Sequence, residues 1–139
     1  MSLSQQDIIA IRSTWAFAAS NPQSAGRLFY ARLFEIAPSA RALFPEGMAA
    51  QELKLIQTLD VVVDSLDRLG DLAPELTRLG DSHAALGAEP AHYDLVGEAL
   101  LWTLGELAGG SFNADARAAW TRAYGYVAGE MMAAGQTRA

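Results

Sequence analysis

Three features of this 139-residue sequence predict an all-α fold. Apolar residues recur at steps of three and four along each long segment, which is the period of a helix with one buried face. Prolines and glycines separate those segments, and residues that favour helix starts precede them. No segment shows convincing alternation of the kind typical of a half-buried strand. The pattern indicates about seven helices of unequal length, which favours an irregular helical sandwich over an up-and-down bundle.

The first three helices are marked by their starts. Ser4 and Asp7 have the spacing of a capping box, so the first helix is expected to begin after Ser4. Asn21 and Pro22 provide a cap residue followed by proline at the first helical position, which indicates the start of the second helix. Pro38 begins a short third helix, and a loop containing proline and glycine follows it.

The remaining helices are marked by apolar periodicity and by glycine. A long helix is expected over about residues 49–69, where leucine and valine recur at steps of three or four. A shorter helix is expected over about residues 73–86 and ends at Gly87. Pro90 lies at the start of the next helix, and the last helix begins near Asn113. The turns between these helices are short, as in compact helical domains.

Composition limits the functions open to the chain. The net charge is −6 and the isoelectric point about 4.7, so nucleic acids and anionic membrane surfaces are not expected as partners. The absence of cysteine excludes disulfides, thiolate metal sites, cysteine nucleophiles and thioether attachment of a cofactor. The first residues do not resemble a signal peptide, and no apolar run is long enough to span a membrane. We therefore expect one cytoplasmic domain over residues 1–139, with a core large enough to enclose a pocket.

His83 is the most informative residue for function. Together with Leu76, Leu79 and Leu86 it falls on one face of a helix, which we expect to turn toward the core. A side chain that can be charged near neutral pH is unfavourable there unless a nitrogen lone pair is needed, as in metal ligation. Taken alone, a hydrogen-bonded core histidine is the simpler alternative. The second histidine, His92, is expected in the capping region of the next helix.

A buried haem would need such a residue. It requires a neutral imidazole on one face of its iron, apolar walls, and a hydrogen-bond donor on the other face if O2 is to be held. His83 can supply the imidazole. Gln51 and Leu55 are four residues apart and share a helix face, so Gln51 can place its amide over a ligand while Leu55 restricts the space. Tyr30 carries a hydroxyl that needs a partner once it is buried.

Five segments, in order and at suitable spacings, carry a family resemblance. They are Leu28–Phe34 (LFYARLF), Pro38 with Phe44, Gln51 with Leu55, His83 with Gly87 and His92–Gly97 (HYDLVG), and Trp120–Gly125 (WTRAYG). Together they extend over nearly the whole chain. On these segments the sequence resembles bacterial single-domain haemoglobins and is similar to the globin domain of flavohaemoglobins.

This resemblance implies a globin-like fold around haem b, with His83 as the proximal ligand of the iron. Tyr93 would lie on the same side near His83, and Leu79 would help to wall the pocket. The other ring nitrogen of His83 is expected to donate to a backbone carbonyl one turn earlier, at Leu79. That bond would fix the tautomer of the imidazole.

On the opposite, distal side, the resemblance implies that Tyr30 and Gln51 donate hydrogen bonds to a bound gas. Phe44 would pack on the porphyrin face, and Leu55 would help to wall the pocket. Bound O2 carries more negative charge than bound CO, so such donors favour O2. We therefore expect high affinity for O2 with slow release, and we expect NO and CO as further ligands.

The sequence departs from the family pattern in one place, and its alignment is open in another. Many flavohaemoglobin-type globins place a glutamate late in the last helix to bond the proximal histidine, and Gly135 occupies that place here. Without a carboxylate the imidazole has less anionic character, so strong peroxidase-like activation is not expected. In the long helix, a shift of three residues would put Lys54 over the iron instead of Gln51.

Three functions fit these residues. The first is reversible binding of O2 by a haem protein for storage, delivery or sensing. The second is dioxygenation of NO to nitrate, which would require a separate reductase because no strand-flanked G-x-G-x-x-G motif indicates a nucleotide-binding domain. The third is a globin-fold module that binds a partner protein without haem.

Overall fold

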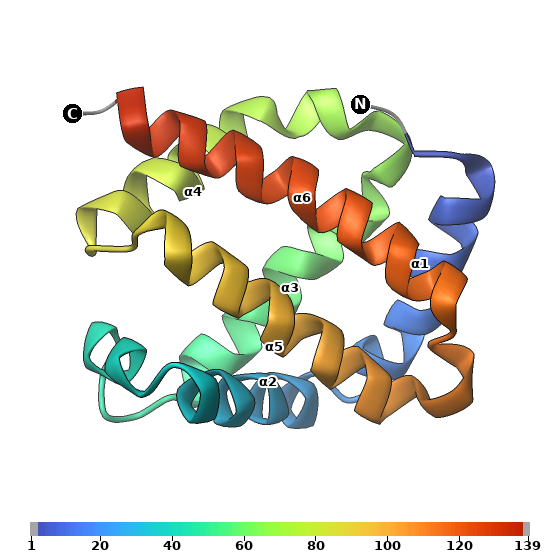
Figure 1. The fold of residues 1–139 in the computed structure, drawn as a ribbon, viewed down its shortest axis with the longest axis horizontal. Coiled ribbons are helices and arrows are strands. Elements are labelled where there is room, and N and C mark those ends of the chain that lie inside the picture. Colours follow the sequence, from blue (N-terminus) through green and yellow to red (C-terminus); the bar gives the residue numbers. More distant parts are fainter. Residues whose placement is uncertain (1–2, 138–139) are drawn as a thin grey trace.

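The computed structural model describes residues 3–137, which are mostly helical (Figure 1). The elements in order are α1 (Gln5–Ala19), α2 (Pro22–Ile36), η1 (Pro38–Leu43), α3 (Ala49–Asp64), η2 (Leu66–Leu72), α4 (Ala73–Ala85), α5 (Pro90–Ala108), η3 (Gly109–Ser111) and α6 (Ala114–Thr137), where η denotes a 3₁₀ helix. Strands are absent from the part of the chain that the structure describes. The prediction of an all-α fold is therefore confirmed.

Local sequence signals set several of the helix ends. In the capping box of α1, the Asp7 N–H donates to Ser4 Oγ at 3.0 Å and the Ser4 N–H donates to Asp7 Oδ2 at 3.1 Å. At the end of α4, Gly87 has a φ of +96° and the Ala88 N–H donates to the His83 carbonyl at 2.9 Å. This arrangement is a Schellman motif, in which the left-handed position favours glycine. Both boundaries agree with those predicted.

Close helix crossings shape the centre of the molecule. In Figure 1, α5 and α6 run side by side in opposite directions, while α3 crosses behind them. The backbones of α4 and α6 meet at Gly80, where an ideal Cβ would lie 2.3 Å from the carbonyl oxygen of Met131. A similar contact joins α2 to α3 at Gly26, whose ideal Cβ would lie 2.3 Å from the carbonyl oxygen of Glu52. Only glycine permits such crossings without moving a helix.

The hydrophobic core consists of two clusters. The larger one includes the rings of Trp15 and Trp120, whose centroids lie 5.9 Å apart. Trp120 Nε1 donates to Thr14 Oγ1 at 2.8 Å, so the buried indole keeps a hydrogen bond between α6 and α1. The smaller cluster is centred on Leu76 and Met131, between α4 and α6. Several of the candidate residues described below belong to one or the other of these two clusters.

The long helix predicted over residues 49–69 is shorter in the structure. α3 ends at Asp64, and the Ser65 N–H donates to the carbonyls of both Val61 and Val62, at 3.1 and 3.0 Å. The chain then tightens into η2, in which Arg68 leaves helical geometry (φ −148°, ψ 46°). This change of winding turns Leu66 and Leu72 into the core. The predicted boundary was therefore wrong, although both segments are helical.

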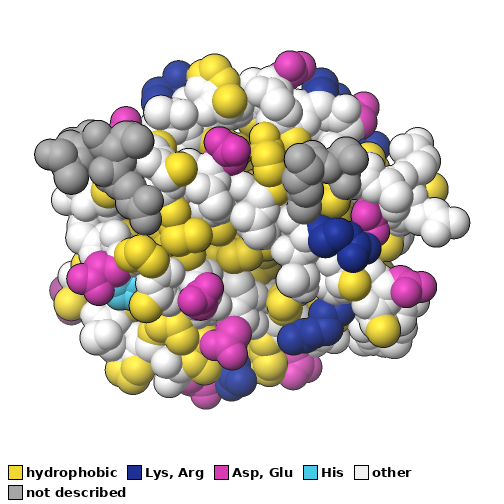
Figure 2. All heavy atoms as spheres, turned by 45° about the horizontal axis from the view of Figure 1, so that its top comes forward, with side chains coloured by type: hydrophobic (Ala, Val, Ile, Leu, Met, Phe, Trp, Pro, Cys, Tyr) yellow, Lys and Arg dark blue, Asp and Glu magenta, His cyan; other side chains and the backbone are white. Residues whose placement is uncertain are grey.

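The face at the top of Figure 1, where α6 passes over α4, comes forward in Figure 2. Hydrophobic side chains gather across the middle of this face, and acidic and basic side chains are mixed around them. None of the described helices combines the length and the apolar character needed to cross a membrane.

Candidate functional site

Two of the predicted site residues meet across the crossing of α2 and α3. Gln51, in the first turn of α3, donates from Nε2 to the hydroxyl oxygen of Tyr30 at 3.0 Å. Tyr30 lies on α2 and is buried, with 5% of its surface exposed. Lys54, which an alternative alignment would place here, has an exposed side chain. The structure therefore brings Gln51, and not Lys54, to Tyr30.

The surroundings of Tyr30 keep its hydroxyl protonated. Its ring makes edge contacts with Phe29 and Phe44, at centroid distances of 4.9 and 5.3 Å. Burial raises the pKa of Tyr30, the hydrogen bond from Gln51 lowers it, and the charge of Glu52 raises it further. The net effect is a raised pKa. Because Gln51 donates to the hydroxyl oxygen, the hydroxyl hydrogen remains available, and it has no acceptor among the described residues.

Apolar side chains flank this pair of polar groups. Phe44, just after η1, lies 5.6 Å from the ring of Phe34 in centroid distance. Phe44 and Leu55 are half-buried and pack against the larger hydrophobic cluster. Phe44 thus contacts the ring of Tyr30 directly, and Leu55 belongs to the same hydrophobic cluster.

One ring nitrogen of His83 is hydrogen-bonded, and the other has no partner among the described residues. Its Nδ1 lies 2.6 Å from the carbonyl oxygen of Leu79, one turn earlier in α4, so the predicted bond is present. A carbonyl only accepts hydrogen bonds, and Nδ1 therefore carries the hydrogen when the ring is neutral. That tautomer leaves the lone pair on Nε2, which has no partner among the described residues.

The predicted burial of His83 is wrong. Leu76, at the start of the same face of α4, is 1% exposed, but the side chain of His83 is exposed and Leu86 is 67% exposed. The helix packs on α6 near Leu76 and Gly80, and positions further along this face emerge from the core. The imidazole therefore lies at the surface end of an apolar stripe, where it is accessible.

Tyr93 completes the group around His83. The centroids of the two rings lie 6.4 Å apart, and burial raises the pKa of Tyr93. Tyr124 of α6 donates from its hydroxyl to the Tyr93 carbonyl at 2.5 Å, and its ring packs against Gly97. Sequence reasoning placed Tyr124 in a motif but did not identify this bond, which joins residues 31 positions apart.

The position aligned with the late-helix glutamate of flavohaemoglobin-type globins is Gly135. It lies in α6, but its burial and surroundings are outside the part of the chain that is described.

The candidate residues form two groups, which follow the two hydrophobic clusters. Tyr30, Phe44 and Leu55 belong to the larger cluster, whereas Leu79 and Tyr93 belong to the smaller one. One group offers a phenol and an amide, and the other offers an imidazole with a free Nε2. Half-buried apolar side chains accompany both. This set of donors fits a haem group, which needs one neutral nitrogen ligand, apolar walls and a distal donor.

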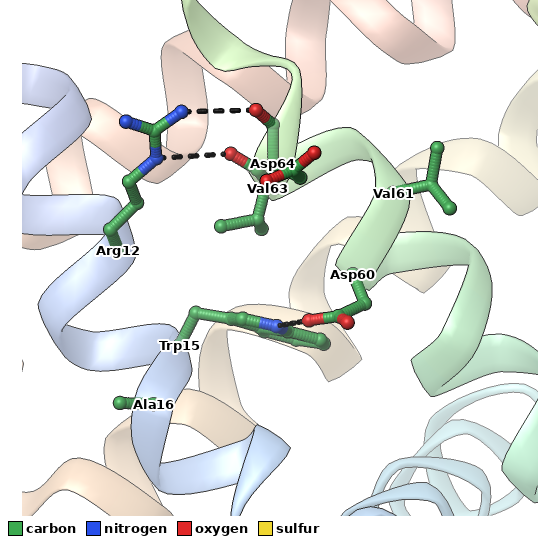
Figure 3. A pocket seen from close by; sticks show the side chains of 7 residues that line it. All are labelled: Arg12, Trp15, Ala16, Asp60, Val61, Val63 and Asp64. Atoms are coloured by element: carbon green, nitrogen blue, oxygen red, sulfur yellow. Dashed lines mark hydrogen bonds between the residues drawn. The ribbon is translucent and has the colours of Figure 1, made fainter.

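A separate cavity of about 390 Å³ lies between α1 and α3 (Figure 3). Its polar lining is internally paired. Arg12 donates to the carbonyls of Val63 and Asp64 at 3.3 and 3.1 Å, and Trp15 Nε1 donates to Asp60 Oδ1 at 2.8 Å. These bonds tie α1 to the end of α3. None of the predicted site residues lines this cavity.

Comparisons with known proteins identify the family that most of the chain matches. Residues 27–131 match the globin family. The neuroglobin of Danio rerio is 32% identical over 143 residues, an alignment that covers 93% of this chain and 90% of that protein. The flavohemoprotein of Vibrio cholerae is 30% identical over 129 residues, covering 91% of this chain and 33% of that longer protein. The flavohemoprotein of Bacillus subtilis is 27% identical over a region of the same length.

Proposed function

The chain belongs to the globin family, and from that premise we propose that it binds haem b through His83 and holds O2 reversibly on the Tyr30 side. The observation that carries this proposal is the hydrogen bond between Gln51 and Tyr30. It brings two polar side chains from different helices together and leaves the hydroxyl hydrogen of Tyr30 without an acceptor among the described residues, as a donor to a bound gas requires.

The ligand role of His83 is supported by its hydrogen bonding. A metal-binding imidazole usually donates its other N–H to a carbonyl or a carboxylate, which orients the ring and selects the tautomer. The bond from Nδ1 to the Leu79 carbonyl has this geometry and leaves Nε2 as the metal-binding atom. Since the acceptor is a neutral carbonyl, the imidazole gains less anionic character than a carboxylate would give it.

The distal residues account for gas selectivity. Ferrous haem, when bound, supplies an open coordination position at which O2 gains partial negative charge. The hydroxyl hydrogen of Tyr30 is free to donate toward that charge, because Gln51 uses only the hydroxyl oxygen. Hydrogen bonds to charged acceptors stabilise by about 1.5–3 kcal/mol, so a slow O2 dissociation rate is expected. CO carries less charge and gains less, and NO is a further ligand of the site.

A second candidate function is the oxidation of NO to nitrate by O2 at the same site. It is favoured by the similarity to flavohemoproteins, at 27–30% identity over one third of their length. Each turnover would need an electron from a separate reductase. The measurement that supports this function is NO-dependent production of nitrate under steady reduction; slow recovery of the ferrous state argues for simple O2 binding instead.

A haem titration tests the central proposal. Ferric protoporphyrin IX added to the purified haem-free chain should give a Soret band with one haem per chain. The ferrous form should then bind O2 and CO reversibly. A chain that stays colourless would contradict the proposal and favour a globin-fold module that binds a partner protein without haem.

A further inference from the structure

The first turn of α3 carries Gln51 but has no side-chain cap of its own. The residue before the helix, Met48, has right-handed helical angles (φ −105°, ψ −6°) and makes no capping hydrogen bond. The first N–H groups of a helix have no partner within the helix, so an uncapped first turn frays readily. The position of Gln51 therefore depends on contacts made by other elements.

One such contact comes from Gln23 on α2. Its Nε2 group donates to the carbonyl oxygen of Ala49 at 3.2 Å and to Oε1 of Glu52 at 2.9 Å. These two acceptors flank Gln51 in the chain, and the bond to Glu52 is charge-assisted. The side-chain amide of Gln23 thus links α2 to the turn of α3 that carries Gln51.

The close crossing of α2 and α3 does not by itself hold the first turn of α3 in one orientation. Gly26, three residues after Gln23, allows the backbone of α2 to approach the carbonyl of Glu52. A glycine contact sets the spacing between the helix axes, but it leaves α3 free to rotate about its own axis. Gln23 bonds one backbone atom and one side-chain atom of the same turn, and this pair of bonds opposes rotation.

We propose that Gln23 is a positioning residue of the distal site, which holds the first turn of α3 so that Gln51 reaches Tyr30. The Gln51 bond is 3.0 Å long, and hydrogen bonds weaken steeply with distance and misalignment, so a small rotation of the turn would break it. The effect of Gln23 on a bound gas rests on the proposed function. The contact itself belongs to the fold and can be tested without haem.

Hydrogen exchange in the haem-free protein is the first test. Gln23→Ala should speed exchange of the Glu52 and Leu53 amide hydrogens by about 3- to 10-fold, because one hydrogen-bonded tie is lost. Gln23→Lys should restore slow exchange, since an ammonium group can donate to the same two acceptors. Gln57→Ala is the matched control, because Gln57 is an exposed glutamine later in α3. Unchanged exchange in Gln23→Ala would overturn the proposal.

The second test uses the haem-loaded protein. Gln23→Ala should speed O2 dissociation by about 3- to 10-fold and shift the C–O stretching frequency of the CO form. In a chain that already carries Gln51→Ala, the same substitution should have no further effect, because Gln23 acts through Gln51. Equal effects in both backgrounds would overturn this role. Failure of the wild-type chain to bind haem would instead overturn the proposed function, and the exchange experiment would still decide the role of Gln23.

Discussion

The amide nitrogen of Gln51 lies 3.0 Å from the hydroxyl oxygen of Tyr30 and donates to it. The direction of this bond matters for the chemistry of the pair. Gln51 occupies a lone pair of the tyrosine oxygen and leaves the hydroxyl hydrogen available. Burial raises the pKa of Tyr30, so the phenol keeps that hydrogen throughout the physiological range. The pair thus has one donor available for a ligand, the Tyr30 hydroxyl, which is oriented by the hydrogen bond from Gln51.

Replacing Tyr30 with phenylalanine should speed O2 dissociation. The substitution removes the donor and keeps the ring contacts, so the expected loss of about 1.5–3 kcal/mol corresponds to a rate about 10- to 150-fold higher. CO dissociation should change less, because bound CO carries less charge. Stopped-flow replacement of O2 by CO measures the rate. Tyr126→Phe, outside the larger cluster, serves as the control. An unchanged O2 rate in Tyr30→Phe would remove Tyr30 from the mechanism.

Much of the fold could be predicted because its signals are local. Ser4 with Asp7 and the glycine at position 87 act within one turn, where sequence spacing and geometry are equivalent. The end of α3 at Asp64 was missed because steps of three fit both an α-helix and a 3₁₀ helix. Leu66, Leu69 and Leu72 are spaced by three residues, which is one 3₁₀ turn, and this spacing is the signal that could have located η2.

Less of the candidate site than of the fold could be predicted from local sequence signals. The meeting of Tyr30 and Gln51 was anticipated only through the family resemblance, because no local rule relates residues 21 positions apart. The exposure of His83 was missed because helical periodicity identifies a face but does not show where that face leaves the core. The contacts of Gln23 and Tyr124 depend on how helices cross, and their side chains give no sequence signal of it.

The two histidines offer a matched comparison of the iron ligand. His83→Gly should abolish tight retention of haem, and added imidazole should restore the absorption spectrum by occupying the vacated position. His92 accepts a hydrogen bond from the Glu89 N–H through Nδ1, at 2.9 Å, in the capping box of α5. His92→Asn keeps an acceptor near this cap and should retain haem. Haem transfer to apomyoglobin measures retention, and equal transfer rates for His83→Gly and wild type would contradict the assignment.

Gly26→Ala should destabilise the protein. The new Cβ would lie 2.3 Å from the carbonyl oxygen and 2.7 Å from the carbonyl carbon of Glu52, so α2 and α3 would have to separate. Overpacking of this kind costs about 1–3 kcal/mol, more than the gain of roughly 1 kcal/mol from replacing a helical glycine. Gly125→Ala, on α6 with nothing within 4 Å of the new Cβ, should show only that gain. Urea unfolding of both haem-free variants checks the difference, and similar stabilities would refute the close crossing.

The ion pair between Asp7 and Arg122 should give the protein a pH-dependent stability. Arg122 NH2 lies 2.6 Å from Asp7 Oδ1, and this hydrogen bond, with that from the Ser4 backbone, lowers the pKa of Asp7 below its ordinary value of 3.8. A carboxylate whose pKa is lowered by folding stabilises the native state above its unfolded pKa, and the contribution disappears as the pH falls through the folded value. Asp7→Asn removes the charge but keeps an acceptor for the Ser4 N–H.

We therefore expect Asp7→Asn to lower the melting temperature at neutral pH, by an amount that shrinks as the pH falls below 3.8 and disappears once the pH is below the lowered pKa of folded Asp7. Glu35→Gln is the control, because its pair with Arg32 is 3.7 Å long and largely exposed. Surface pairs of that kind contribute little. Thermal unfolding followed by circular dichroism across this pH range gives the comparison. A deficit in Asp7→Asn that persists undiminished in acid would show that capping or packing, and not the charge of Asp7, holds α1 to α6.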